Sequence, residues 1–335
     1  MISVDEKYMR MCFALAKKGY GKVAPNPMVG CVVLDRVGNL ISKGYHKKYG
    51  ENHAERDALL KLKNNEAEGG TLYVNLEPCS HFGKTPPCVD LIIKHKLKRV
   101  VIGMTDVNPK VDGITKLKNA GIEVDFVLEE EARFLNRMFI KTMTEKMPYV
   151  VLKTASTMDG KIASKTGSSK WITSETARKE VYRMRKEFDC IMTSSNTVIA
   201  DNPSMQHNFK CILDKDLRTP KDAKIYQQGE IYIASKENTP LKDKQLDIEA
   251  VLKNLYSKGI YSVFVECGGT LAGSMLKDNL IDEVYQFIAP KILNDNNGLS
   301  CFNGADIKEI SQAKNLKIYE LKQIEKDILI KAIVL

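Results

Sequence analysis

Short apolar runs alternate with helical patterns through the first half of the chain. The runs at 29–34, 71–76, 99–104 and 122–127 have the length and composition of buried strands, with a further short strand at 40–43. Apolar residues recur at helical spacing over 5–18, 54–63, 89–95 and 114–119. Strands and helices that alternate in this way predict an α/β fold, in which helices cover the faces of a mixed or parallel sheet.

The second half repeats this rhythm after a break. A charged helical stretch at 129–146 ends at Met147-Pro148, and proline disfavours helical backbone in the residue before it. We therefore predict two domains, 1–146 and 147–335. In the second, we expect helices at 175–187, 248–257 and 270–278, and strands at 149–153, 190–193, 210–213, 231–234, 261–266, 284–288, 316–321 and 328–334.

Composition narrows the class of protein. The chain has 335 residues, of which 43% are hydrophobic and 28% charged, so each domain can bury its own core. No apolar run approaches the roughly 20 residues of a membrane span, and the first ten residues do not resemble a secretory signal, so we expect a cytoplasmic protein with no membrane partner. The net charge of +9 favours anionic partners. Because the lysines are scattered among acids, we expect phosphorylated small molecules and no nucleic acid.

Two of the eight cysteines stand apart from the others. Most lie singly inside apolar runs, as Cys31 does, where a thiol behaves as a small hydrophobic side chain. Cys79 and Cys88 lie in a polar segment that reads as a loop. A disulfide framework is therefore not expected, and this pair indicates metal binding or catalysis.

The cysteine pair belongs to a larger pattern. His53-Ala54-Glu55 begins a predicted helix, Pro78-Cys79 ends a strand and Cys88 opens the next helix, as in the signature of nucleobase deaminases. One imidazole and two thiolates leave a fourth position on zinc open for water, and Glu55 can accept that water's proton. Eight residues separate the two cysteines, where the shortest form of the signature has two, so we expect the longer loop to contact substrate.

A closed structural zinc site is the simpler alternative. It would need His46 or His81 as a fourth ligand. Structural sites favour short ligand spacings, and nothing in that interpretation requires Glu55, so an open hydrolytic site is the better prediction.

With these motifs in place, the chain resembles the bifunctional riboflavin-biosynthesis deaminase/reductase family over nearly its whole length. The first half carries Pro25-Asn26-Pro27-Met28-Val29-Gly30, Gly44-Tyr45-His46 and the complete 77–88 loop. The resemblance implies a cytidine-deaminase-like three-layer αβα domain with one zinc ion. It implies His53, Cys79 and Cys88 as ligands, Glu55 as proton shuttle, and substrate contacts at Asn26, His46, His81, Lys84, Asp106 and Asn108.

The second half matches the family at Lys153-Thr154-Ala155-Ser156, Ser169-Lys170-Trp171, Asp201-Asn202-Pro203 and Glu266-Cys267-Gly268-Gly269. The resemblance implies a dihydrofolate-reductase-like domain that uses NADPH, with Lys153 near the reacting carbon. The implied cofactor contacts are Ala155, Trp171, Thr197, Asp201, Gly268, Gly269, Thr270, Leu271, Ala272, Gly273 and Ser274. The implied substrate contacts are Ser169, Arg185, Met205 and Glu266.

Taken alone, two of these features have plainer interpretations. The Gly268-Gly269 turn is equally typical of a simple connection between strand and helix, and a lone tryptophan such as Trp171 is more often a core residue or hydrophobic anchor. The chain also departs from the family, which usually carries, after Pro203, an arginine that helps hold the substrate phosphate. Either Arg185, His207 and Lys210 replace that arginine, or the reductase binds substrate more weakly.

The resemblance implies two successive reactions on one phosphorylated aminopyrimidine. The first is hydrolytic deamination of 2,5-diamino-6-(5-phosphoribosylamino)pyrimidin-4-one to 5-amino-6-(5-phosphoribosylamino)uracil, and the second is NADPH-dependent reduction of its ribosyl group to ribityl. Family members are expected to form homo-oligomers. The alternatives are a tRNA-type base deaminase with a degenerate second domain, and a zinc-stabilised scaffold without activity. The second domain alone could also bind ligand without reducing it.

Overall fold

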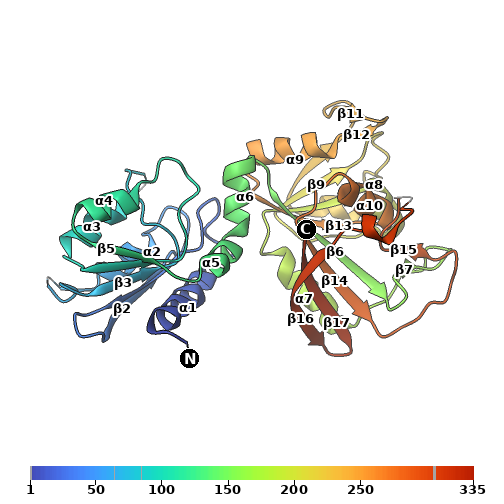
Figure 1. Cartoon of the computed structure of the whole chain (residues 1–335). Coiled ribbons are helices and arrows are strands. Elements are labelled where there is room, and N and C mark those ends of the chain that lie inside the picture. Colours follow the sequence, from blue (N-terminus) through green and yellow to red (C-terminus); the bar gives the residue numbers. More distant parts are fainter. Residues whose placement is uncertain (1, 64, 84, 305–306) are drawn as a thin grey trace. The chain divides into compact units, whose positions relative to one another are not determined.

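The chain forms two compact units, Met1–Lys146 and Met147–Leu335, in a computed structural model that describes residues 2–63, 65–83, 85–304 and 307–335 (Figure 1). Lys84, one of the predicted substrate contacts, lies outside the described residues. Each unit has its own sheet and its own apolar core.

The first unit is built on a five-stranded sheet. Its order is β2 (Leu40–Tyr45), β1 (Gly30–Leu34), β3 (Thr71–Val74), β4 (Arg99–Ile102), β5 (Glu123–Phe126). Strand β1 is antiparallel to both neighbours, while β3, β4 and β5 are parallel. All five residues of β1 are buried, because the sheet is covered on both faces.

Helices cover the two faces of this sheet (Figure 1). A Cβ on Gly30 would lie 2.1 Å from the carbonyl oxygen of Cys12 in α1 (Val4–Ala16), and one on Gly44 would lie 2.4 Å from that of Ala54 in α2 (Ala54–Leu59). Gly44 pairs with Cys31, and consecutive residues of a strand point to opposite faces, so α1 and α2 lie on opposite sides. The predicted three-layer αβα arrangement is confirmed.

The remaining helices of the unit extend these layers. α3 (Cys88–Lys94) lies beside α2, and α4 (Gly113–Asn119) beside α3. On the α1 side, α5 (Glu129–Leu135) is joined to α1 by an ion pair between Arg10 and Glu131 at 3.1 Å. The 3₁₀ turn η1 (Lys17–Gly19) follows α1. The Cys79 and Cys88 segments thus come from the α2/α3 layer.

Two predicted helices differ from those observed. The stretch 129–146 is broken at Asn136 into α5 and α6 (Arg137–Glu145), because the Asn136 amide accepts a hydrogen bond from the Met28 N–H at 2.9 Å and donates to the Met28 carbonyl at 3.1 Å. The helix predicted over 54–63 ends at Leu59. There the Leu62 N–H donates to the Leu59 carbonyl and tightens the chain into a turn.

The second unit contains an eight-stranded sheet. Its order is β10 (Glu230–Ala234), β9 (Phe209–Leu213), β8 (Cys190–Ser194), β13 (Ser262–Glu266), β6 (Tyr149–Thr157), β14 (Glu283–Ala289), β17 (Asp327–Val334), β16 (Leu316–Ile324). The first six strands are parallel to one another, and β17 is antiparallel to both of its neighbours, β14 and β16. Two small ribbons pair β7 (Lys161–Ala163) with β15 (Leu299–Ser300) and β11 (Leu241–Lys242) with β12 (Gln245–Leu246).

Helices lie on both faces of this sheet as well (Figure 1). α9 (Ile248–Ser257) and α10 (Gly269–Lys277) pack on the face that carries Val150 and Val263. On the other face, which carries Phe264, the Phe188 ring after α7 (Glu175–Arg185) lies 4.9 Å from the Phe264 ring. The sequence did not predict α8 (Ser195–Asp201). The 3₁₀ turns η2 (Lys224–Gln227) and η3 (Ile310–Gln312) complete the unit.

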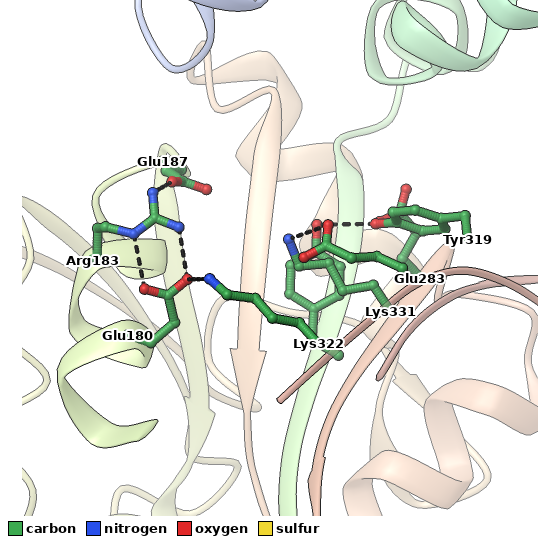
Figure 2. A network of polar contacts seen from close by, with 9 residues as sticks. Glu180, Arg183, Glu187, Glu283, Tyr319, Lys322 and Lys331 are labelled. Atoms are coloured by element: carbon green, nitrogen blue, oxygen red, sulfur yellow. Dashed lines mark hydrogen bonds and ion pairs between the residues drawn. The ribbon is translucent and has the colours of Figure 1, made fainter. Parts of the chain in front are cut away.

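A polar network ties the antiparallel strands to the rest of the sheet (Figure 2). Glu283 of β14 is fully buried, and its carboxylate accepts hydrogen bonds from the hydroxyls of Tyr149 and Tyr319, each at 2.6 Å. At the edge, Lys322 of β16 lies 3.7 Å from Glu180 of α7. A buried carboxylate with two donors is satisfied, so β6, β14 and β16 are held together through one side chain.

Within the described part of the chain, no helix combines the length and the apolar character needed to cross a lipid bilayer.

Candidate functional site

Three predicted ligands converge in the first unit. His53 precedes α2, Cys79 follows β3 and Cys88 begins α3. The Nδ1 atom of His53 lies 3.5 Å from each cysteine sulfur, and the three ligand atoms lie within 4.8 Å of one another. The backbone N–H of Cys88 also donates to the Cys79 sulfur at 3.3 Å, which fixes the second thiol beside the first.

This geometry fits zinc. With Zn–S near 2.3 Å and Zn–N near 2.0 Å at tetrahedral angles, a ligand nitrogen and sulfur on one ion lie about 3.5 Å apart. The observed 3.5 Å separations agree with that value. Among the described residues these three form the only such group of metal-ligating side chains, so the donor set is that of an open site with three protein ligands.

Glu55 lies beside this group. It is on the first turn of α2, two residues after His53, and only 3% of its surface is exposed. Burial raises the pKa of the Glu55 carboxyl to about 7, with a further contribution from Cys79. A carboxyl whose pKa lies near neutrality can both accept and return a proton, which is the property required of a proton shuttle.

His46 is not a fourth ligand. Its Nδ1 lies 3.0 Å from the Asn52 carbonyl oxygen and its Nε2 lies 3.1 Å from the Asn26 side-chain nitrogen. The Nδ1–H must therefore donate to the carbonyl while Nε2 accepts from the Asn26 amide. Burial also lowers the pKa of His46, which favours this neutral form. The His46 ring thus orients Asn26, another predicted substrate contact.

His81 does not belong to the metal group either. Its Nδ1 atom is buried and makes no hydrogen bond, and the same holds for the Thr85 hydroxyl in the same loop. Buried polar atoms are nearly always paired in folded proteins. The 79–88 loop therefore carries two polar groups available to a ligand.

Glu77 was missed by the sequence interpretation. Its buried carboxylate accepts hydrogen bonds from the backbone N–H groups of Asp106 at 3.2 Å, Gly113 at 2.9 Å and Ile114 at 3.1 Å. Nearby, the Ser80 hydroxyl accepts from the Asp112 N–H at 2.7 Å. An acidic residue directly before the Pro-Cys pair was the available signal, but its role depends on a loop about thirty residues away, as the separations in sequence show.

That loop carries two further predicted substrate contacts. Burial raises the pKa of Asp106 to about 6, and its carboxylate accepts from the Asn108 N–H at 2.8 Å. The Asn108 side chain accepts in turn from the Lys110 N–H at 3.1 Å. Both side chains are therefore fixed within the loop that Glu77 attaches to the Cys79 segment.

In the second unit, a cavity of about 1280 Å³ collects most of the predicted reductase residues. Those that line it are Lys153, Ala155, Ser169, Trp171, Arg185, Thr197, Asp201, Met205, Glu266, Gly268, Gly269, Thr270, Leu271 and Ser274. Ala272 and Gly273 do not line it. Ala272 is buried in the core, and a Cβ on Gly273 would lie 1.7 Å from the Asn303 carbonyl oxygen, so both residues pack away from the cavity.

Three charged groups meet at the carboxyl ends of β6 and β13. Glu266 pairs in register with Lys153, whose Nζ lies 3.6 Å from its carboxylate, and Arg185 of α7 donates to the same carboxylate at 2.5 and 3.0 Å. Burial alone would raise the pKa of Glu266, but the charges of Arg185 and Lys153 outweigh it and lower that pKa. Glu266 therefore stays ionised and holds both cations at the cavity wall.

Trp171 is neither a core residue nor a buried anchor. It is 61% exposed and lines the cavity, with the Arg178 guanidinium 4.2 Å from its ring centroid. The Arg178 side chain also donates to the Thr173 carbonyl at 2.9 Å. The Trp171 ring is thus held in place as an apolar surface that lines the cavity.

His207 and Lys210 do not supply the missing phosphate contact. Lys210 is fully buried and donates to the Ile225 carbonyl. The Nε2 atom of His207 lies 2.9 Å from the Phe188 carbonyl oxygen, and its Nδ1 accepts from the Phe209 N–H at 3.1 Å. Neither residue lines the cavity. Both are committed to backbone groups, so this part of the expectation was wrong.

Comparison with known proteins covers both units. Residues 2–104 match the family described as the cytidine and deoxycytidylate deaminase zinc-binding region, and residues 148–330 match the RibD C-terminal domain. The riboflavin biosynthesis protein RibD of Aquifex aeolicus is 41% identical, over 98% of each chain, and that of Actinobacillus pleuropneumoniae is 38% identical, over 99% of this chain and 96% of its own.

Solved structures agree over the full length. RibD of Acinetobacter baumannii has a TM-score of 0.86 at 36% identity, covering 99% of each chain. The Thermotoga maritima diaminohydroxyphosphoribosylaminopyrimidine deaminase/5-amino-6-(5-phosphoribosylamino)uracil reductase gives the same TM-score, identity and coverage.

Proposed function

The chain belongs to the bifunctional riboflavin biosynthesis deaminase/reductase family, and from that premise we propose which substrate, cofactors and residues serve its two activities. We assign deamination to residues 1–146 and reduction to residues 147–335. The substrate of the first step is 2,5-diamino-6-(5-phosphoribosylamino)pyrimidin-4-one. Its product, 5-amino-6-(5-phosphoribosylamino)uracil, is the substrate of the second, in which the ribosyl group becomes ribityl.

The observation that carries the deaminase proposal is the placement of buried Glu55 beside three ligand atoms spaced for zinc. His53, Cys79 and Cys88 would hold one zinc ion, which when bound supplies a Lewis acid that lowers the pKa of water. Glu55 accepts a proton as water attacks the ring carbon that bears the amino group. It gives this proton to the ring nitrogen, then takes the proton of the hydroxyl group now on that carbon and passes it to the departing ammonia as the carbonyl forms.

The neighbouring loops would hold the pyrimidine in place. We propose that Asn26, oriented by His46, and Asp106, fixed by the loop that Glu77 anchors, contact the substrate. The unpaired His81 Nδ1 supports a third contact, from the 79–88 loop. Asn108 would act beside Asp106, and Lys84 is kept as a proposed contact from the family resemblance alone.

The cavity of the second unit supports NADPH as reductant. When bound, the nicotinamide supplies the hydride, and the chain supplies position and charge. We propose that Lys153, held at the cavity wall by Glu266, lies next to the reacting ribosyl carbon, with Arg185, Ser169 and Met205 around the substrate. The cofactor would extend from Ala155 and Trp171 past Thr197 and Asp201 to the turn before α10.

The substrate phosphate needs a cation near Met205. Arg185 is engaged by Glu266, but Lys224 lines the cavity, and its backbone N–H donates to the Asn202 side chain at 2.8 Å. We propose that Lys224 takes the place of the arginine that the family usually carries after Pro203.

Two assays test the proposal on the purified full-length chain. Ammonia release from the phosphorylated diaminopyrimidinone, together with stoichiometric zinc, tests the first step. Loss of absorbance at 340 nm, with NADPH and the deaminated product, tests the second. Deamination of an RNA oligonucleotide in place of the free pyrimidine would support the tRNA-type alternative, and absence of both activities would support a scaffold.

A homo-oligomer is proposed from the family alone. Light scattering of the eluted protein measures its mass directly, and a mass near the 37.7 kDa of one chain would contradict it.

A further inference from the structure

We propose that Asp327, at the start of β17, is a positioning residue of the reductase. Through a hydrogen bond to Ser174 it holds the wall segment, residues 169–173, in place beside the cavity of the second unit. The inference deepens the proposed function and rests on it, because it assumes that reduction takes place in this cavity. Asp327 is not among the residues that the family resemblance implies.

The wall segment lies directly before α7. All five of its residues line the cavity, and they include Ser169 and Trp171, one proposed substrate contact and one proposed cofactor contact. Ser174 follows as the N-cap of α7, and its hydroxyl accepts from the Ala177 N–H at 3.2 Å. At the other end of α7, Arg185 also lines the cavity. The placement of α7 therefore sets the positions of cavity groups at both of its ends.

The hairpin of β16 and β17 contacts α7 at three points. The Asp327 carboxylate accepts from the Ser174 N–H at 2.8 Å, and Glu325 accepts from the Thr176 hydroxyl at 2.7 Å. Figure 2 shows the third contact, in which Lys322 of β16 reaches α7. Asp327 and Ser174 are 153 residues apart in the chain, so the last strand of the sheet fixes the start of a helix from an earlier part of the unit.

Asp327 is the most deeply buried of the side chains that hold the wall segment. Four side chains bond to this segment or to Ser174 next to it: Asp201, Arg178, Lys291 and Asp327. Of these four, only Asp327 is fully buried. A buried hydrogen bond does not compete with water, and its loss would leave the buried Ser174 N–H unpaired. The loss of Asp327 is therefore expected to shift the wall segment most.

The charge of Asp327 suits its place. Its carboxylate lies at the N-terminus of α7, a helix of 11 residues, where the helix dipole favours a negative group. Hydrogen bonds from a backbone N–H to a carboxylate are shorter and stronger than those to a neutral acceptor. A carboxylate at this position thus fixes the start of the helix, and the wall segment before it, more firmly than an amide or a hydroxyl would.

The second oxygen of Asp327 argues against a purely structural role. Its Oδ1 atom is buried and has no hydrogen-bond partner among the described residues. A buried acceptor without a donor costs stability, and natural proteins accept such costs mainly at functional sites. The carboxylate is therefore better explained by the wall segment that it holds than by the stability of the strand that it begins.

Trp171 gives a direct readout of the wall segment. It is the only tryptophan of the chain, it lies in the middle of the segment, and it is 61% exposed. Tryptophan fluorescence of the full-length protein therefore reports on this segment alone. Quenching by acrylamide measures how accessible the ring is, and this measurement needs neither substrate nor turnover.

The test compares variants of the full-length enzyme. We expect Asp327→Ala to change the acrylamide quenching of Trp171 and to raise the KM for NADPH about tenfold, equivalent to about 1.4 kcal/mol, with kcat much less affected. Asp327→Asn keeps an acceptor but loses the charge, so both of its values should be intermediate. Glu325→Gln changes the exposed contact two residues away on the same hairpin and is the matched control, which should leave both values unchanged.

The outcomes separate this inference from a structural role and from the reductase proposal. Unchanged quenching and KM in Asp327→Ala, with a lower free energy of unfolding in urea, would overturn the inference. If Asp327→Ala does not fold, Asp327→Asn decides in its place, and a variant identical to the unmodified enzyme in both values overturns the inference equally. If the unmodified enzyme oxidises no NADPH, the reductase proposal fails, while the quenching of Trp171 still decides whether Asp327 holds the wall segment.

Discussion

The reactive atoms of the first unit come from short segments at the ends of α2, β3 and α3, within 4.8 Å of one another, whereas the cavity of the second unit is walled by residues from Lys153 to Asn303. In the first, a few ligands of fixed type provide the chemistry. In the second unit, residues from many segments together set the shape and the charge of the cavity. The difference teaches that a metal centre concentrates its function in a few side chains, while a large cavity distributes it over many.

The largest expected effect is the loss of deamination on replacing Glu55, a single side chain of the first unit. Glu55→Gln should lower the kcat for deamination by about 10²- to 10⁴-fold, the contribution typical of a general acid and base, while zinc content and NADPH oxidation with the deaminated substrate remain unchanged. Zinc analysis with the two activity assays measures all three. Asp57→Asn, on the same helix but paired with Lys47 and Lys61, is the control. Loss of zinc in Glu55→Gln would contradict the assigned role.

In the second unit, Glu266→Gln should spread its effect over several groups. Removing the carboxylate leaves Arg185 and Lys153 as neighbouring cations without their partner, and breaking a buried ion pair typically costs about 3 kcal/mol of stability. We expect reductase kcat/KM to fall about a hundredfold, and the free energy of unfolding of this unit to fall, with deamination intact. Urea denaturation and NADPH oxidation report the two effects. Glu187→Gln, two residues after the end of α7 and paired with Arg183 at 2.7 Å, is the matched control, and a purely catalytic loss at unchanged stability would contradict the shared role.

A smaller effect is expected at Glu77. Replacing its carboxylate by an amide in Glu77→Gln weakens the bonds from Asp106, Gly113 and Ile114, and one such charge-assisted bond is worth about 1.5 kcal/mol. The KM for the diaminopyrimidinone should rise about tenfold with kcat and zinc content little changed. Steady-state kinetics measures the split. Glu68→Gln, at an exposed ion pair with Lys96, should have no effect, and a fall in kcat alone would argue against a positioning role.

The smallest effect is a pH dependence. Burial raises the pKa of Asp106 to about 6, so the carboxylate is largely protonated below that pH. If the ionised form contacts substrate, the KM for deamination should rise as the pH falls through about 6, and Asp106→Asn should remove the dependence. Because the folded-state pKa lies above the ordinary value of 3.8, this group contributes stability below 3.8 and loses it as the pH rises through about 6. A KM unaffected by pH would contradict the proposed contact.

The sequence predicted the zinc ligands and the α/β architecture because both depend on local patterns. Helix 248–257 was predicted with its observed bounds, and helices near 89 and 114 within one residue of them. It did not predict the break at Asn136, the role of Glu77 or the short helix α8. The first two depend on contacts between residues far apart in the chain, and α8 buries only Ser195 and Val198, so it shows no apolar period. The orientation of His207 and Lys210 toward backbone carbonyls was also invisible in the residue types.

The two hydrogen bonds between Asn136 and Met28 limit how short a fragment of the first unit can be while keeping its fold. The Asn136 side-chain amide bonds to the N–H and the carbonyl of Met28, two residues after Asn26. Asn136 lies 32 positions beyond residue 104, the last residue of the matched zinc-binding region. A fragment trimmed to that region would keep His53, Cys79 and Cys88. It would lose α4, β5, α5, α6 and Asn136, whose side chain holds the segment after Asn26. The compact first unit, Met1–Lys146, is therefore longer than the zinc-binding region within it.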